Sequence, residues 1–189
     1  MSVKLFALTC GHLTGDLGYL MEGGEGQAEL PIPAYLIEHP KGTVLFDTGM
    51  HPDCQRDPAA RLGARVTGLF SFHYRPGEEI SARLQAVDRD PAKIDIIVNS
   101  HFHFDHVGGN ALIPNAVMIV QKREWEAGMD PDIAAQRGER RLPQRVHDRE
   151  QMFASLEKLA RFEAAGTRIF FGHDSEFWKT VPQAPKAIV

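Results

Sequence analysis

The chain has 189 residues, of which 43% are apolar and 24% are charged, as is ordinary for a soluble globular protein. Its 21 basic and 25 acidic residues are well mixed and give a net charge of −4, which argues against nucleic acid and anionic membranes as partners. This length favours a single domain that spans residues 1–189 and can bury a core.

The compartment is indicated by what the sequence lacks. No apolar run reaches the length that crosses a membrane, and the first residues do not resemble a signal peptide. Cys10 and Cys54 lack the spacing of a metal site. A disulfide between them stays open, but free thiols in a reducing cytoplasm agree better with so few cysteines, and we expect a cytoplasmic protein.

The N-terminal part of the chain predicts three strands and one loop. Residues 3–10 form an apolar run typical of a strand. Residues 11–26 contain six glycines but no phosphate-binding pattern, so we expect a plain loop at the mouth of a site. Residues 33–38 and 43–47 flank a turn that contains Pro40 and Gly42, and they predict a hairpin.

The second strand of this hairpin runs into Asp47-Thr48-Gly49, where the carboxylate can accept hydrogen bonds from backbone N–H groups of a tight turn. Residues 57–62 then look like the start of a helix. Residues 78–87 predict an amphipathic helix, and the apolar run 66–74 before it predicts core. The apolar face of the predicted helix consists of Ile80, Leu84 and Val87.

The most distinctive stretch is Ser100–Asn110, which follows the apolar run 94–98. It reads Ser-His-Phe-His-Phe-Asp-His-Val-Gly-Gly-Asn, with three histidines and one aspartate within six residues. The pattern predicts a buried strand that ends in a loop, with a glycine pair where the chain turns tightly.

The spacing inside this loop points to metal binding. His101 and His103 project to the same side of an extended segment, Asp105 continues that side, and His106 is set off by one residue. Such a loop can offer two imidazoles to one ion, and a carboxylate with a third imidazole to a second ion. These ligands suit Zn, Fe or Mn, and the absence of cysteine argues against a purely structural zinc site. A histidine-rich surface loop is the alternative.

The C-terminal part predicts two strands and two helices. Residues 116–120 predict a buried strand, and residues 121–127 begin a helix. The clearest helix spans residues 148–166, with an aspartate as N-cap and a glycine as stop. Residues 167–172 predict a strand that delivers His173 at its end. The inner face of the long helix is predicted to be Met152, Phe153, Leu156 and Leu159.

These motifs carry a resemblance to a known family. His101-Phe102-His103-Phe104-Asp105-His106 matches the HxHxDH signature of the metallo-β-lactamase superfamily, and the flanking residues resemble the N-acyl homoserine lactone lactonases in particular. Asp47-Thr48-Gly49 resembles the first motif of that family, and residues 170–174 resemble its last metal-ligand motif. The resemblance implies an α/β fold, the metallo-β-lactamase αββα sandwich.

The resemblance also implies a metal site and its ligands. His101 and His103 hold a first ion, and Asp105, His106 and His173 hold a second. Asp47 orients a ligand histidine from behind, a role compatible with its turn. Two zinc ions are expected, with Fe, Mn or Co as alternatives.

The implied activity is hydrolysis of a lactone ring of the N-acyl homoserine lactone type through a metal-bound hydroxide, with Asp105 as the catalytic residue that passes a proton to the leaving alkoxide. The expected partner is a small-molecule lactone or ester, and a homodimer is one option. The substrate-binding residues are unknown, although residues 66–74 would lie near the site. Other esterases and thioesterases share the first motif and remain the alternative.

The family pattern is incomplete in this chain. Between His106 and His173 there is one histidine, His147, and neither a Gly-His-Thr loop nor a recognisable bridging aspartate. The shortfall falls near residues 129–139, so the second half of the sandwich is expected to be incomplete. A truncated, catalytically impaired metal-binding relative is therefore a further alternative.

Overall fold

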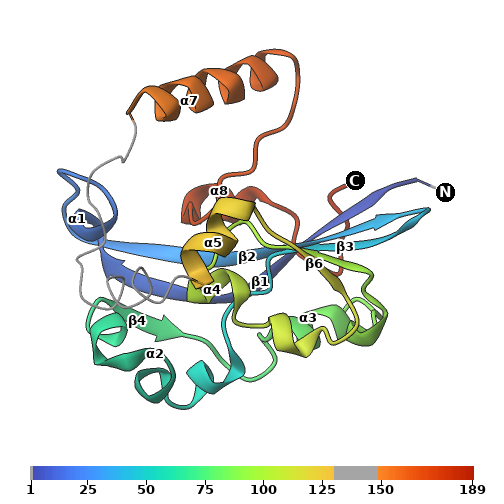
Figure 1. The fold of residues 1–189 in the computed structure, drawn as a ribbon, viewed down its shortest axis with the longest axis horizontal. Coiled ribbons are helices and arrows are strands. Elements are labelled where there is room, and N and C mark those ends of the chain that lie inside the picture. Colours follow the sequence, from blue (N-terminus) through green and yellow to red (C-terminus); the bar gives the residue numbers. More distant parts are fainter. Residues whose placement is uncertain (1, 130–148) are drawn as a thin grey trace.

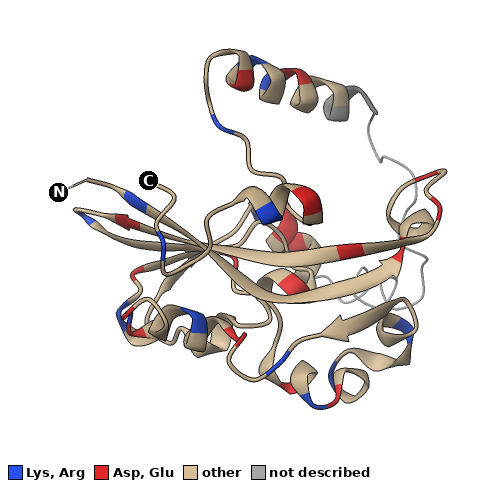
Figure 2. Ribbon diagram, turned by 180° about the vertical axis from the view of Figure 1, so that it is seen from behind, with Lys and Arg blue, Asp and Glu red and all other residues tan. Residues whose placement is uncertain are grey.

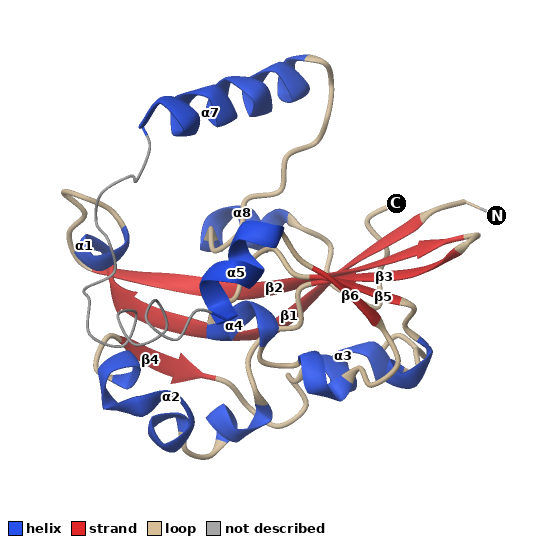
Figure 3. Ribbon diagram, in the orientation of Figure 1, coloured by secondary structure: helices blue, strands red, loops and turns tan. Residues whose placement is uncertain are grey.

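The structure is a computed structural model that describes residues 2–129 and 149–189, with side chains described for residues 2–129 and 153–189. These residues form one six-stranded sheet in the order β4-β1-β2-β3-β5-β6 (Figures 1 and 3). β4, β1, β2 and β3 pair in antiparallel fashion, whereas β3, β5 and β6 are parallel. The strands are β1 (Lys4–Asp16), β2 (Gln27–His39), β3 (Gly42–Phe46), β4 (Phe70–His73), β5 (Ile96–Val98) and β6 (Val117–Ile119).

Helices lie on both sides of this sheet. α2 and α3 lie on one side, and α7 and α8 lie on the other (Figure 1). The helices are α1 (Leu17–Leu20), α2 (Pro58–Thr67), α3 (Ile80–Gln85), α4 (Phe104–Val107), α5 (Lys122–Met129), α7 (Arg149–Ala164) and α8 (Ser175–Thr180). Three single 3₁₀ turns are η1 (Pro52–Gln55), η2 (Pro91–Lys93) and η3 (Asn110–Leu112).

The glycine-rich stretch is only in part the loop that its composition predicts, because β1 continues to Asp16 and α1 follows, which leaves residues 21–26 as the loop. Two of its glycines allow close packing instead. Gly11 has a φ of 88° beside the register shift in β1, and a Cβ there would lie 2.8 Å from the ring of Tyr74. A Cβ on Gly15 would lie 2.7 Å from the ring of Phe70. These contacts with β4 and the residue after it come from distant sequence, which composition alone does not reveal.

Three other predictions for the N-terminal half are confirmed, whereas the helix predicted over residues 78–87 is shorter, and in the run 66–74, which was predicted to be core, only Tyr74 is buried. β2 and β3 form the expected hairpin, with Tyr35 opposite Phe46. The carboxylate of Asp57 caps α2 by accepting a hydrogen bond of 2.9 Å from the N–H of Ala60. Ile80, Leu84 and Val87, the predicted apolar face, are all buried in the core.

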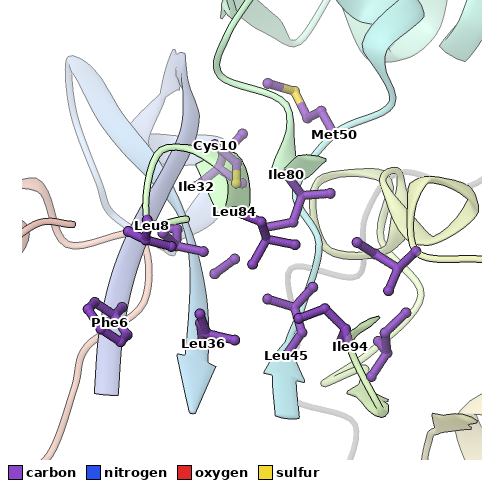
Figure 4. Close-up of a cluster of buried hydrophobic side chains, with 14 of the residues drawn as sticks. Phe6, Leu8, Cys10, Ile32, Leu36, Leu45, Met50, Ile80, Leu84 and Ile94 are labelled. Atoms are coloured by element: carbon purple, nitrogen blue, oxygen red, sulfur yellow. The ribbon is translucent and has the colours of Figure 1, made fainter. Parts of the chain in front are cut away.

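The main core fills the space between α3 and one face of the sheet. Figure 4 shows side chains of β1, β2 and β3 gathered around Ile80 and Leu84, which belong to this helix. Full burial of an aliphatic side chain such as Leu84 contributes about 1.5–3 kcal/mol. Cys10 and Cys54 are buried free thiols of this core. Its labelled members in Figure 4 are Phe6, Leu8, Cys10, Ile32, Leu36, Leu45, Met50, Ile80, Leu84 and Ile94.

The opposite face of the sheet carries a smaller cluster. Alternation along β1 turns Ala7 away from the main core, and Ala7 packs there with Trp178 and Val181. The rings of Tyr35 and Trp178 meet edge to face with centroids 5.8 Å apart. This cluster fixes α8, and with it the segment that carries His173.

Three expectations for the C-terminal half are wrong. β6 forms where a buried strand was expected, but its three side chains are exposed (64%, 46% and 48% for Val117, Met118 and Ile119). Residues 167–172 contain no strand. α7 ends before Gly166, which has a φ of 87°, as predicted. Of its predicted inner side chains, Phe153, Leu156 and Leu159 are exposed, and Met152 lies outside the residues whose side chains are described. Figure 1 shows α7 standing apart from the sheet.

These errors have a common reason. An αββα sandwich has two sheets, and the part of the chain that the structure describes contains one. The apolar periodicity of α7 and the apolar residues of β6 predict that these surfaces pack against another layer. No described element covers them. The predicted shortfall near residues 129–139 and the cap at Asp148 lie outside the described residues, apart from Met129 at the end of α5.

The surface agrees with the mixed charge of the sequence. Figure 2 shows acidic and basic residues interspersed over the helices and the strand ends. Among the described residues, no helix combines the length and the apolar character needed to cross a membrane.

Candidate metal centre

The site forms where two parallel strands end. β3 and β5 are neighbours, so their carboxyl ends, and the loops that follow them, meet at the same edge of the sheet. The N–H of Asp47 donates to the carbonyl of Val98 at 3.0 Å. The N–H of Thr48 donates to the carbonyl of His106 at 2.8 Å. The Asp47 turn and the histidine loop are thus joined by backbone hydrogen bonds.

The histidine loop is extended only as far as His103, and α4 then adds a single helical turn. The expectation that Asp105 continues the extended side is therefore wrong. The turn instead directs both Asp105 and His106 inward, where each is 7% exposed. The sequence correctly predicted that Asp105 and His106 both face the site. It did not predict the helical turn that brings them there.

The glycine pair after α4 allows the loop to lie against the Asp47 turn. A Cβ on Gly108 would lie 2.2 Å from the backbone nitrogen of His51, and one on Gly109 would lie 2.4 Å from the carbonyl oxygen of Thr48. Both distances are far shorter than van der Waals contact. Only glycine permits this approach, so the pair is a packing requirement of the site.

Three of the predicted ligands come together. The Nε2 atoms of His106 and His173 lie 3.1 Å apart. The Oδ2 atom of Asp105 lies 3.4 Å from Nε2 of His106 and 3.6 Å from Nε2 of His173. In the part of the chain that the structure describes, this is the one group of three such side chains whose ligand atoms lie within 4.8 Å of one another.

The outer ring nitrogens of both histidines are engaged. Nδ1 of His173 lies 3.0 Å from the carbonyl oxygen of Pro31, which can only accept, so this nitrogen carries the hydrogen. Nδ1 of His106 lies 2.8 Å from the carboxylate of Asp47 and donates to it in the same way. In neutral imidazoles this leaves the two Nε2 lone pairs directed at each other.

Two lone pairs at that distance repel unless a positive charge lies between or beside them. Burial lowers the pKa of His106, but hydrogen bonds to Asp105 and Asp47 outweigh it and raise this pKa to about 9. Burial raises the pKa of Asp105, and His106 with the charge of His173 outweighs that effect and lowers it. A proton meets the need for positive charge, and the donor set fits a divalent metal ion equally well.

The predicted first pair of ligands lies beside this group. The ring centroids of His101 and His103 are 4.4 Å apart, and those of His101 and His106 are 4.1 Å apart. Burial, followed by the neighbouring histidines, lowers the pKa of His101 to about 4, so its ring is neutral. His103 is exposed. His147 lies outside the described residues.

Asp47 supports both halves of the site through a residue that the sequence analysis missed. Its carboxylate accepts hydrogen bonds of 2.8 Å from both the N–H and the hydroxyl of Ser100. The hydroxyl oxygen of Ser100 in turn accepts from Nδ1 of His101 at 2.9 Å, which leaves Nε2 of His101 unprotonated. Asp47 thus makes both predicted kinds of contact: its carboxylate accepts from a backbone N–H group, and it orients a candidate ligand histidine. The only signal for Ser100 was its place directly before His101.

Comparison with known proteins places the chain in a family. The model of the metallo-beta-lactamase superfamily matches residues 28–173. The chain belongs to the metallo-β-lactamase superfamily. The expected fold class is confirmed, and the histidine loop, the Asp47 turn and His173 all lie within the matched residues.

Similar sequences include named lactonases. The N-acyl homoserine lactonase AttM of Azorhizobium caulinodans is 34% identical over 132 residues, which make up 69% of this chain and 50% of the relative. The N-acyl homoserine lactonase AiiA of Bacillus thuringiensis subsp. kurstaki is 35% identical over 100 residues, or 53% of this chain and 40% of the relative. The chain thus spans half or less of the length of these curated relatives.

Similar solved structures support the fold. An N-acyl homoserine lactone hydrolase with the product N-hexanoyl-L-homoserine at its catalytic metal centre has a TM-score of 0.81 and 23% identity, with 99% of this chain and 100% of that chain covered. The dizinc quorum-quenching lactonase AidC, with a bound product, has a TM-score of 0.51 and 20% identity, with 66% and 44% covered.

Proposed function

We propose that this protein is a metal-dependent hydrolase that opens a lactone ring of the N-acyl homoserine lactone type. The observation that carries the proposal is the pair of facing Nε2 atoms of His106 and His173, 3.1 Å apart beside the carboxylate of Asp105. The named activity of the similar lactonases supports the choice of substrate class.

Zinc is the metal we propose, with Fe, Mn or Co as alternatives. Asp105, His106 and His173 would hold one ion, and His101 with His103 would hold the other. A bound zinc ion supplies Lewis acidity, which polarises a carbonyl group and makes water a better nucleophile at neutral pH.

The chain's own residues have distinct parts in this reaction. Asp47 holds His106 directly and His101 through Ser100, so that each presents Nε2 to the site. We assign Asp105 as the group that takes the proton of the attacking water and gives it to the alkoxide oxygen released when the ring C–O bond breaks. The carboxylate is ionised before the reaction begins, because His106 and His173 lower its pKa against the opposing effect of burial.

A second candidate function is metal binding with impaired catalysis. His101 and His103 form a pair, and the neighbouring His106 already belongs to the group with Asp105 and His173, so one ion would have fewer protein ligands. A related esterase or thioesterase activity is the alternative among enzymes. We also propose a single cytoplasmic domain, and the exposed side chains of β6 are the surface we assign to a homodimer.

Metal analysis and product detection test the proposal together. Protein loaded with zinc is incubated with N-hexanoyl homoserine lactone, and the ring-opened acid is followed by liquid chromatography. About two ions per chain with turnover that is abolished in His173→Ala supports the proposal. His39→Ala, at the distant β2–β3 turn, is the control and keeps activity. Substoichiometric zinc without turnover of lactones, thioesters or β-lactams contradicts it.

A further inference from the structure

The two halves of the metal centre are supported differently. His106 and His173 are fixed by Asp47 and by the carbonyl of Pro31. The segment His101-Phe102-His103, here called the histidine arm, lies at the surface of the loop. Its middle residue turns to the opposite side from the two histidines, because successive side chains of an extended segment alternate.

Helix α5 meets this middle residue at three points. The N–H of Phe102 donates to Oε1 of Glu124 at 2.9 Å. The ring of Phe102 meets that of Trp125 with centroids 6.3 Å apart and planes at 66°. Gly128 lies so close to the ring that a Cβ there would be 2.6 Å from Cδ2 of Phe102. Figure 1 shows α5 lying beside α4.

We propose that Glu124 is a positioning residue for the histidine arm and that α5 is the element through which it acts. A carboxylate that accepts from the Phe102 N–H fixes the peptide between His101 and Phe102, and the ring contacts fix the side on which Phe102 lies. Together they set the directions in which His101 and His103 leave the backbone. This inference rests on the metal centre proposed above, but it does not depend on the substrate.

The arm has particular need of such support. The arm itself offers two imidazoles, and the neighbouring His106 belongs to the group with Asp105 and His173, so among the described residues an ion on the arm gains little from additional ligands. Its affinity therefore depends on how well the two rings are oriented before the metal arrives. Supporting residues around metal ligands typically change metal affinity by about 10–100-fold. The group of Asp105, His106 and His173 has its own supports and should be insensitive to α5.

Zinc titration of Glu124→Ala and Glu126→Ala provides the test. Glu126 lies on the same helix and pairs at the surface with Lys122 at 3.5 Å, so it is the matched control. In Glu124→Ala we expect the weaker of two zinc equivalents to lose about 10-fold or more in affinity. The affinity of the tighter zinc equivalent should not change in Glu124→Ala. Glu126→Ala should bind both equivalents with the affinities of the unaltered protein. Glu124→Gln, whose amide oxygen still accepts from Phe102, restores most of the affinity.

A second variant guards against simple unfolding. Gly128→Ala leaves Glu124 in place and favours the helix, but its methyl group displaces the Phe102 ring. We expect the same selective loss of the weaker equivalent. The amide resonance of Phe102 and the ring resonances of His101 and His103 in metal-free protein report the arm directly, and they should shift in both variants.

The outcomes separate this inference from the proposed function. Selective loss of the weaker equivalent supports the role of Glu124 even where no lactone is opened. Turnover with unchanged zinc binding and unchanged histidine resonances in Glu124→Ala and Gly128→Ala overturns it while the function stands. An unaltered protein that takes up a single equivalent also overturns it, because the arm then holds no ion.

Discussion

Asp47 is the residue on which the orientation of the candidate ligands most depends. It is buried, has a φ of 59°, and contacts both His106 and Ser100 through one carboxylate. Asparagine tolerates this backbone region, so Asp47→Asn keeps the turn while it removes the negative charge. The substitution therefore separates the orienting role from the turn role.

We expect Asp47→Asn to weaken zinc binding by about 10–100-fold, because His106 loses its anionic hydrogen-bond partner. Isothermal titration calorimetry with zinc measures the change. Asp88→Asn is the control, because Asp88 has the same φ of 59° on an exposed turn away from the site. Equal affinity in both variants would show that the charge of Asp47 is not needed.

At the scale of elements, the histidine loop depends on its glycine pair. Gly108→Ala places a methyl group against backbone atoms of Met50 and His51, which cannot move as a side-chain end can. We expect a loss of about 1–3 kcal/mol or more in the free energy of unfolding, with weaker zinc binding. Urea unfolding measures it. Gly172→Ala meets open space and should change the unfolding free energy little, and a small effect at both glycines would contradict the packing argument.

The end of β2 and the turn after α3 are joined by an ion pair between Glu38 and Arg89. The hydrogen bond from Arg89 holds the pKa of Glu38 below its usual value of 4.5. Because the folded pKa is the lower one, the stabilisation is complete above the unfolded pKa and is lost as the pH falls through the folded value.

We expect Glu38→Gln to lower the free energy of unfolding by less than about 1 kcal/mol near neutral pH, since the pair is partly exposed. The difference from the unaltered protein should vanish in acid, below the folded pKa of Glu38. Urea unfolding across this pH range measures it, with exposed Glu22→Gln as the control. A difference that does not change with pH would contradict the assigned linkage.

Across the whole molecule, local pattern predicted the elements well and their environments less well. The hairpin, α3 and the histidine loop follow from short-range periodicity and turn residues, and each is present. The first part of the glycine-rich stretch was misread because Gly11 and Gly15 allow contacts with Tyr74 and Phe70, far along the chain. Ser100 and Glu124 were missed for the same reason. Ser100 contacts Asp47 and Glu124 contacts Phe102, and both contacts join residues far apart in the sequence, whereas the histidine motif is read from adjacent residues.

The same distinction explains α7 and β6, whose apolar patterns predict burial in a sandwich although no described element covers them. Among the residues that the structure describes, β6 is the last strand of the sheet, and it therefore presents an open edge with exposed apolar side chains. Such an edge is a template for pairing with another strand. We therefore expect concentration-dependent self-association of the purified protein.

Val117→Lys should reduce this association, because a lysine on an edge strand opposes strand pairing. Sedimentation velocity over a range of concentrations measures it. Val189→Lys is the matched control: Val189 is 68% exposed, similar to the 64% of Val117, but lies at the C-terminus away from the edge. If β6 is the interface, only Val117→Lys shifts the protein towards monomer. If both variants or neither do so, association does not proceed through the open edge, and the proposed homodimer surface is wrong.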